Sequence, residues 1–130
     1  MEPAQLIVDA MNVIGSRPDG WWRDRAGALR ALVRRLTRYA EESGAAVIVV
    51  MDGAPTPIGV DANDGVEVRF APGGPNAADI VIAGIVDEAA DPMGVVVVTS
   101  DRALARRVAA AGATVRGARW LLDELDARER

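Results

Sequence analysis

Four aspartates stand where strands should end or helices should begin, and they are the clearest chemical signal in the chain. Asp9 follows Leu-Ile-Val, Asp52 follows Val-Ile-Val-Val-Met, Asp79 follows Asn-Ala-Ala, and Asp101 follows four valines and Thr-Ser. Parallel strands bring their carboxyl ends to one edge of a sheet, where α/β proteins bind ligands. Carboxylates gathered there repel one another unless a cation neutralises them. The pattern therefore predicts a hard divalent metal ion and, with it, a phosphate ester as substrate.

The two aspartates at predicted strand ends also have structural interpretations. Asp9 and Asn12 fit an Asx-turn that only shapes the following loop, and Asp52 with Gly53 is a common turn pair. In the functional interpretation both carboxylates bind a metal ion such as Mg²⁺, and the Asn12 amide donates to a phosphate or orients a water molecule. Both interpretations stay open at the level of the sequence.

The two aspartates at predicted helix starts are ambiguous in a similar way. Asn76 fits a helix N-cap with Asp79 in the first turn, and Ser100 fits another N-cap with Asp101 in its first turn. In the functional interpretation, both carboxylates bind the metal ion, and the hydroxyl groups of Thr99 and Ser100 lie near a phosphate. Taken together, four acids in such positions favour a shared divalent site.

The composition excludes several kinds of catalysis. The chain contains no cysteine and no histidine, and all 15 basic residues are arginine. Thiolate metal sites, Ser-His triads, Schiff-base lysines and a P-loop lysine are therefore absent. A general base must come from a carboxylate or from water activated by a divalent ion. The net charge of −4 is unusual for a nucleic-acid-binding protein, but the four proposed ligands account for all of it.

The hydropathy pattern predicts one three-layer α/β/α domain over residues 1–130, with a mostly parallel central sheet. Apolar runs of about seven residues are too short to cross a bilayer, and the N-terminus has no basic leader, so we expect a cytoplasmic protein that does not contact the membrane. Predicted strands cover 5–9, 46–52, 66–70, 94–99 and 114–116, and predicted helices cover 24–43, 76–90, 101–111 and 120–127. Residues 12–22, 53–65 and 72–75 are predicted loops.

Arginines and tryptophans cluster around the first predicted loop. Arg17, Arg23 and Arg25 flank it and are candidates for contacts with a nucleic-acid backbone. Trp21 and Trp22 are adjacent, so we expect one to pack inward; the other either stacks on a base or covers the start of the helix.

At this point the motifs resemble a known family. Residues 8–15, Val-Asp-Ala-Met-Asn-Val-Ile-Gly, resemble the Val-Asp-Gly-Tyr-Asn-Val-Ile opening of NYN domains, in particular of their YacP-like branch. Asp52, the Ala-Ala-Asp79 helix start and residues 98–102, Val-Thr-Ser-Asp-Arg, fall in the family's order. NYN domains are relatives of the PIN-domain and 5′-nuclease fold. The chain departs from the pattern at Ala10, Met11 and Asn76, which bears on substrate contacts more than on the metal site.

The resemblance implies a ribonuclease that depends on Mg²⁺ or Mn²⁺ and has RNA as its partner. Its acidic set, both catalytic and metal-binding, comprises Asp9, Asp52, Asp79 and Asp101. The substrate-binding candidates are Asn12, Asn76, Thr99, Ser100, Arg102, Arg17 and Arg23. In-line attack of water on the phosphodiester predicts 5′-phosphate and 3′-hydroxyl products.

Two other functions compete with this interpretation. An aspartyl-phosphate phosphatase or phosphotransferase also uses strand-end aspartates, but it usually needs Asp-x-Asp-x-Thr and a lysine, and this chain has neither. A non-catalytic RNA-binding or ribosome-associated module would keep the same fold with little turnover. The sequence leaves open the identity of the RNA, endonucleolytic or exonucleolytic cleavage, the oligomeric state, and whether the ribosome or an RNA-processing factor takes part.

Overall fold

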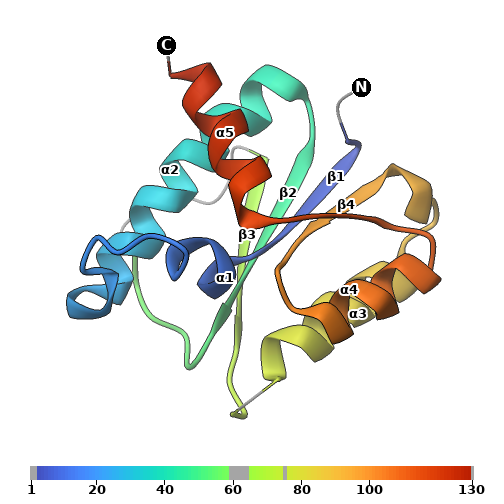
Figure 1. The fold of residues 1–130 in the computed structure, drawn as a ribbon, viewed down its shortest axis with the longest axis horizontal. Helices are drawn as coiled ribbons and strands as arrows, with labels where there is room; N and C mark the ends of the chain where they lie inside the picture. Colours follow the sequence, from blue (N-terminus) through green and yellow to red (C-terminus); the bar gives the residue numbers. More distant parts are fainter. Residues whose placement is uncertain (1–2, 59–64, 75, 130) are drawn as a thin grey trace.

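A computed structural model describes residues 3–58, 65–74 and 76–129. They form an α/β fold with one five-stranded sheet (Figure 1). The strands are β1 (Gln5–Asp9), β2 (Ala46–Asp52), β3 (Val66–Ala71), β4 (Val95–Val98) and β5 (Thr114–Arg116). The α-helices are α1 (Ala10–Ile14), α2 (Arg25–Ser43), α3 (Ala77–Glu88), α4 (Arg102–Ala110) and α5 (Ala118–Arg128), with short 3₁₀ turns η1 (Trp21–Arg23) and η2 (Pro92–Gly94).

All the strand pairs are parallel, in the order β3-β2-β1-β4-β5. The connection from β3 to β4 crosses over β2 and β1, so the strand order reverses between β1 and β4. A reversal of this kind opens a crevice at the carboxyl ends of the strands. The register sets Val8 beside Val98 and Asp9 beside Val50, so Thr99 follows β4 at the level of Asp9 and β2 continues two residues further.

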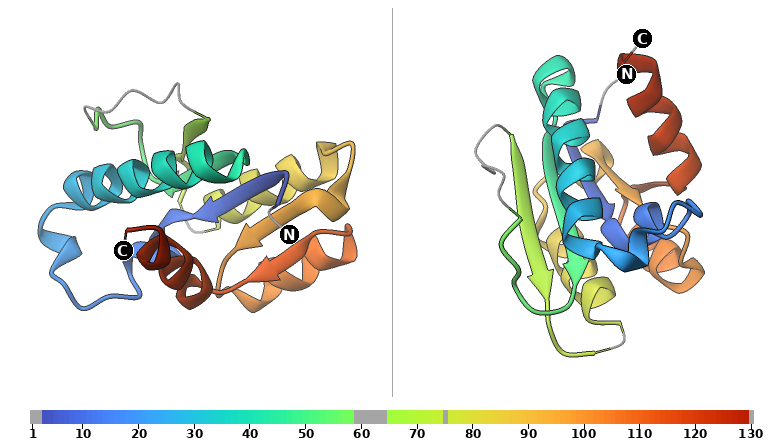
Figure 2. Two further views of the ribbon diagram at one scale, coloured as in Figure 1. Left: turned by 90° about the horizontal axis from the view of Figure 1, so that it is seen from above. Right: turned by 90° about the vertical axis from the view of Figure 1, so that its left-hand side faces the viewer.

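Helices cover both faces of the sheet, which confirms the predicted three layers (Figure 2). Helices α1, α2 and α5 pack on one face through a core that includes Val13, Leu36 and Leu121. Helices α3 and α4 pack on the other face, where Ile82 and Leu104 are buried. The nearly continuous Val/Ile runs of the central strands fit this arrangement because both of their faces are covered. Within the described residues, no helix is long and apolar enough to cross a membrane.

The main difference from the predicted elements lies directly after β1. Residues from Asn12 onward were predicted as loop, but Ala10–Ile14 form a helix that begins immediately after Asp9. Its buried residues Ala10, Val13 and Ile14 have helical spacing and attach it to the core. The remaining predicted boundaries lie within two residues of the observed ones. Of the predicted loops 53–65 and 72–75, residues 59–64 and residue 75 lie outside the described residues.

Candidate active site

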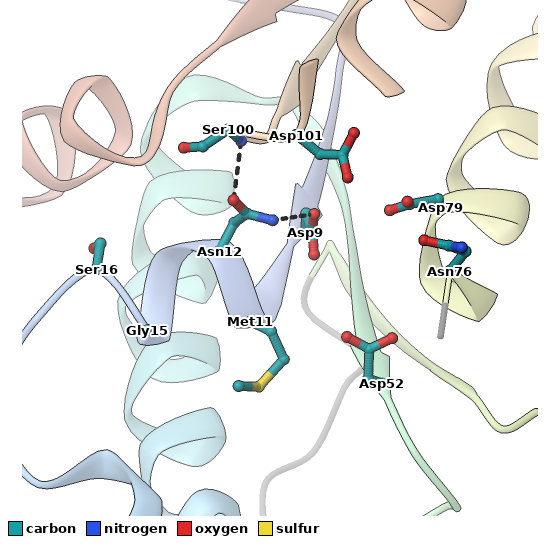
Figure 3. A pocket seen from close by; sticks show the side chains of 10 residues that line it. All are labelled: Asp9, Met11, Asn12, Gly15, Ser16, Asp52, Asn76, Asp79, Ser100 and Asp101. Carbon is teal, nitrogen blue, oxygen red and sulfur yellow. Dashed lines mark hydrogen bonds between the residues drawn. The ribbon is translucent and has the colours of Figure 1, made fainter. Parts of the chain in front are cut away.

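Strand alternation turns two of the aspartates to the same side of the sheet. In β1, Leu6 and Val8 face the α2 side, whereas Ile7 faces α3 and α4, so Asp9 follows Ile7 to that second side. By the same alternation in β2, Asp52 follows Ile48 and Val50 to the second side. Figure 3 shows both carboxylates directed toward Asp79, in the first turn of α3, and Asp101, before α4.

Asp9 is held by a ring of hydrogen bonds between the ends of β1 and β4. Asn12 Nδ2 donates to Asp9 Oδ2 at 2.5 Å, and the Thr99 hydroxyl donates to the same oxygen at 3.0 Å. The Asp101 amide donates to Thr99 Oγ1 at 3.1 Å, and the Ser100 amide donates to Asn12 Oδ1 at 3.1 Å. Both donors to Asp9 therefore use Oδ2, and Oδ1 accepts none of the hydrogen bonds found among the described residues.

The hydrogen bonds show which of the proposed turn and cap contacts are formed. Asp9 occupies the N-cap position of α1 but makes no side-chain capping bond, so its carboxylate is not used to begin that helix. Asp101, not Ser100, caps α4, because its Oδ1 accepts from the Leu104 amide at 2.9 Å. Asn76 precedes α3 with a left-handed backbone (φ 67°) and makes no side-chain capping bond.

One cavity of about 530 Å³ joins the four aspartates (Figure 3). Its wall consists of Asp9, Met11, Asn12, Gly15, Ser16, Asp52, Asn76, Asp79, Ser100 and Asp101. We call it the acidic cavity. Seven of the predicted site residues are thus brought together, and Thr99 lies buried beneath them. Asp9 and Thr99, each 3% exposed, are the buried polar side chains of the described ranges.

Burial and, to a smaller extent, neighbouring charges disfavour the ionised form of two carboxyl groups of the acidic cavity, those of Asp9 and Asp79. Burial raises the pKa of Asp9 to about 6, against the hydrogen bonds from Thr99 and Asn12, and the charges of Asp79 and Asp52 raise it further. Burial also raises the pKa of Asp79, with further contributions from the charges of Asp101 and Asp52. A cation in the cavity would relieve this repulsion.

The residues of the cavity fit a hard divalent cation by the chemistry of their donor atoms. Carboxylate oxygens are the ligands that Mg²⁺ and Mn²⁺ prefer, and Asp9 Oδ1 is left without a donor in the described structure. No three acidic side chains of the described ranges already converge as a group that could hold a metal ion. The half-buried carboxylates of Asp52, Asp79 and Asp101 would therefore have to turn inward to share one ion.

Three predicted substrate-binding arginines do not line the acidic cavity. Arg17 lies next to α5, where its guanidinium is 3.8 Å from Asp126. Arg23 lies over the ring of Trp22, 5.9 Å from its centroid, and Arg102 is exposed on the first turn of α4. A fourth arginine, Arg25, lies at the edge of the cavity.

The sequence interpretation missed three residues of the cavity wall, which are Met11, Gly15 and Ser16. All three belong to α1 or follow it directly. The helical spacing of Ala10, Val13 and Ile14 is a signal for α1, but three apolar positions in five residues are too few to identify a helix from the sequence. Gly15 fits because a Cβ there would lie 2.8 Å from the Met11 carbonyl oxygen.

Comparisons with known proteins agree with this architecture. A crystal structure of a single-residue mutant of Rae1 (YacP) from Bacillus subtilis superposes with a TM-score of 0.77 and 28% sequence identity, over 100% of this chain and 78% of that one. A second crystal structure of Rae1 (YacP) from Bacillus subtilis gives a TM-score of 0.77 and 29% identity, over 97% of this chain and 75% of that one. A search of curated proteins gave no match.

The family model described as the YacP-like NYN domain matches residues 6–130. That range contains every residue of the acidic cavity and all of the five strands except Gln5, the first residue of β1. The chain therefore belongs to the family of YacP-like NYN domains, which are nuclease-like modules linked to RNA.

Proposed function

We propose that this protein is a divalent-metal-dependent ribonuclease that hydrolyses RNA phosphodiesters in the acidic cavity. The observation that carries the proposal is that Asp9, Asp52, Asp79 and Asp101 line one cavity at the carboxyl edge of a sheet in a YacP-like NYN domain. Burial, with a smaller contribution from the neighbouring carboxylates, raises the pKa of Asp9 and of Asp79, and this cost of ionisation supports a cation as the normal occupant.

Each side chain has a role in this proposal. The four carboxylates would hold Mg²⁺ or Mn²⁺, and such an ion, when bound, activates water and neutralises charge on the phosphate oxygens. Asn12 and Thr99 hold the Asp9 carboxylate through Oδ2, which would leave Oδ1 available to bind the ion. The exposed side chains of Asn76 and Ser100 lie on the cavity wall, where their polar groups would position the RNA.

Removal of the metal ion tests this function directly. We expect the purified protein to cleave labelled RNA with Mn²⁺ or Mg²⁺ and not with EDTA, and we expect the Asp9→Asn variant to be inactive with either ion. The products should carry 5′-phosphate and 3′-hydroxyl ends, and a 2′,3′-cyclic phosphate would contradict attack by water. Cleavage that persists in EDTA would exclude the proposed chemistry.

A second function keeps one observation in its favour. Because no three acids of the described residues already converge as a metal-binding group, a non-catalytic RNA-binding module, with or without the ribosome or RNA-processing factors as partners, agrees with the same geometry. Calorimetric measurement of Mn²⁺ binding distinguishes the two functions. Binding that is lost in Asp9→Asn supports the enzyme, whereas RNA binding without any Mn²⁺ binding supports the module.

The pair of tryptophans supplies a proposed base-stacking surface next to the cavity. The Trp21 ring packs on the core and lies 3.9 Å from the position of a Cβ on Gly15, which lines the cavity. Trp22 meets Trp21 edge to face at 5.9 Å and is 57% exposed, with Arg23 over its ring. Trp22 thus presents an exposed aromatic ring that is connected to the acidic cavity through Trp21 and Gly15.

Substitution of Trp22 by alanine is expected to weaken the binding of single-stranded RNA by about fivefold to 150-fold, which corresponds to the usual ~1–3 kcal/mol for loss of one stacked base. Because Trp22 is exposed, the midpoint of thermal unfolding should change little. Trp21→Ala is the matched variant, and its main effect should be a lower unfolding midpoint. Fluorescence anisotropy with a labelled oligonucleotide measures the first effect; equal RNA affinity of Trp22→Ala and wild type would rule out stacking.

A further inference from the structure

Arg25 lies where the acidic cavity continues into a second depression. Its Nη2 is 3.5 Å from Met11 Sδ and 3.5 Å from the Asp52 carbonyl oxygen, and both of these residues line the acidic cavity. The second depression has a volume of about 360 Å³ and is lined by Arg25, Asp52, Gly53, Gly74 and Asn76. Since Asp52 and Asn76 belong to both walls, the two depressions adjoin, and we call the second one the Arg25 groove.

The guanidinium of Arg25 keeps its hydrogen-bonding capacity for a ligand. Both of its contacts are at the outer limit of a hydrogen bond and involve neutral acceptors. Within the described residues it forms no ion pair, in contrast to five arginines that line neither depression and pair with acidic side chains: Arg35, Arg38, Arg107, Arg119 and Arg128. A fork of exposed N–H groups of this kind binds phosphate oxygens with two parallel hydrogen bonds.

The walls of the groove allow a polynucleotide backbone to approach closely. Gly53 and Gly74 have positive φ angles of 108° and 89° and carry no side chain, and no heavy atom of the described structure lies within 4 Å of where a Cβ would be on either. A single strand of RNA in the groove would therefore contact the main chain at Gly53 and Gly74 and the positively charged guanidinium of Arg25. Positive charge beside an acidic site also offsets the repulsion between the carboxylates and RNA.

We propose that Arg25 binds the phosphate of the nucleotide adjacent to the one cleaved, and that the Arg25 groove is the path by which single-stranded RNA leaves the acidic cavity. This inference rests on the proposed ribonuclease function for its assignment of the neighbouring phosphate. Arg25 acts as a binding and positioning residue, and it lies next to Asp52 through the main-chain contact described above.

The test compares Arg25→Ala with Arg25→Lys and with Arg34→Ala, a matched loss of charge at an exposed position farther along α2. Binding of a fluorescein-labelled oligouridylate is measured by anisotropy over a series of salt concentrations, in wild type with EDTA and in the Asp101→Asn background with Mg²⁺. We expect Arg25→Ala to lose about tenfold in affinity, as for one charge-assisted contact. The slope of log K against log salt should fall by about 0.7, the value for one phosphate contact on a single strand.

Arg25→Lys should keep the slope and lose part of the affinity, because it keeps the charge and loses the fork. Arg34→Ala should match its parent protein in both measures. If Arg25→Ala instead behaves like Arg34→Ala, or if the parent protein binds no oligouridylate, the inference is overturned. Cleavage is assayed in parallel. If Arg25→Ala weakens RNA binding but the wild-type protein cleaves no RNA, the proposed ribonuclease function is contradicted and the Arg25 contact is established. If the protein cleaves RNA but Arg25→Ala binds as tightly as its parent, the ribonuclease function is supported and the Arg25 contact is contradicted.

Discussion

If Asp101 is one of the proposed metal-binding carboxylates, Asp101→Asn is expected to lower the rate of RNA cleavage by about 100-fold or more, since loss of a direct metal ligand should exceed the effect of removing a residue that only supports a ligand. The domain should stay folded. Asp101 caps α4 by accepting from the Leu104 amide, and asparagine is an equally good N-cap, so the substitution removes charge and keeps the cap. RNA binding should stay the same or improve, because one charge that repels phosphate is gone.

Asp24→Asn is the matched control for Asp101→Asn. Asp24 caps α2 by accepting from the Gly27 amide at 2.9 Å, and it does not line the acidic cavity. The same chemical change at the same kind of position should therefore leave cleavage unchanged. Asp101→Ala should add a loss of about 1 kcal/mol of stability to the loss of cleavage, because the cap goes as well. Cleavage by Asp101→Asn at the wild-type rate would remove Asp101 from the acidic set.

The second large effect concerns Asp9 and the stability of the metal-free protein. At pH 7, Asp9→Asn is expected to raise the free energy of unfolding by up to about 3 kcal/mol. The folded protein keeps a proton on Asp9 up to about pH 6, because burial raises its pKa from the ordinary value of 3.8. Between pH 3.8 and about pH 6 the folded state binds more protons than the unfolded state. The free energy of unfolding of the wild type therefore falls as the pH rises through this window, and it stays low above it.

Asparagine removes the charge and can still accept the hydrogen bonds from Asn12 and Thr99. Urea denaturation in EDTA between pH 4 and pH 8 should therefore show a falling stability in wild type and a flatter profile in the variant. Added Mn²⁺ should stabilise wild type and leave Asp9→Asn unaffected, because an ion that binds the folded state shifts the equilibrium by mass action. A variant less stable than wild type at pH 7 would show that the Asp9 charge is already compensated in the fold.

The positions of the strands could be predicted because each buried strand coincides with a short run of apolar residues in the sequence. The ranges of β1, β2 and β5 match their predictions, since runs such as Ala-Val-Ile-Val-Val-Met-Asp end at a polar residue on the edge of a covered sheet. Because these strands are apolar at nearly every position, the sequence does not show which face of the sheet each side chain occupies. That Asp9 and Asp52 turn to the α3 side follows from the alternation observed in the core, and it could not be derived from strands that are apolar on both faces.

The very short helix α1 and the contacts between residues far apart in the sequence were the least predictable. Helix α1 has only five residues, too few for a periodic pattern to stand out from a loop that contains glycine and proline. The hydrogen bond from Thr99 to Asp9 joins positions 90 residues apart and depends on the register of β1 with β4. The position of Arg25 beside Asp52 depends in the same way on how α2 begins over the end of β2, which the sequence pattern does not specify.

The placement of β1 between β2 and β4 also has a consequence for the order of events during synthesis. Within the domain, Asp9 is made before β4, before its hydrogen-bond partner Thr99 and before Asp101, whose amide donates to Thr99. Contacts of such high sequence separation form slowly because a long loop must close first. A nascent chain would therefore acquire the first carboxylate early and the complete acidic cavity only once nearly all of the domain had left the ribosome, so the proposed cleavage activity would appear only when folding is complete.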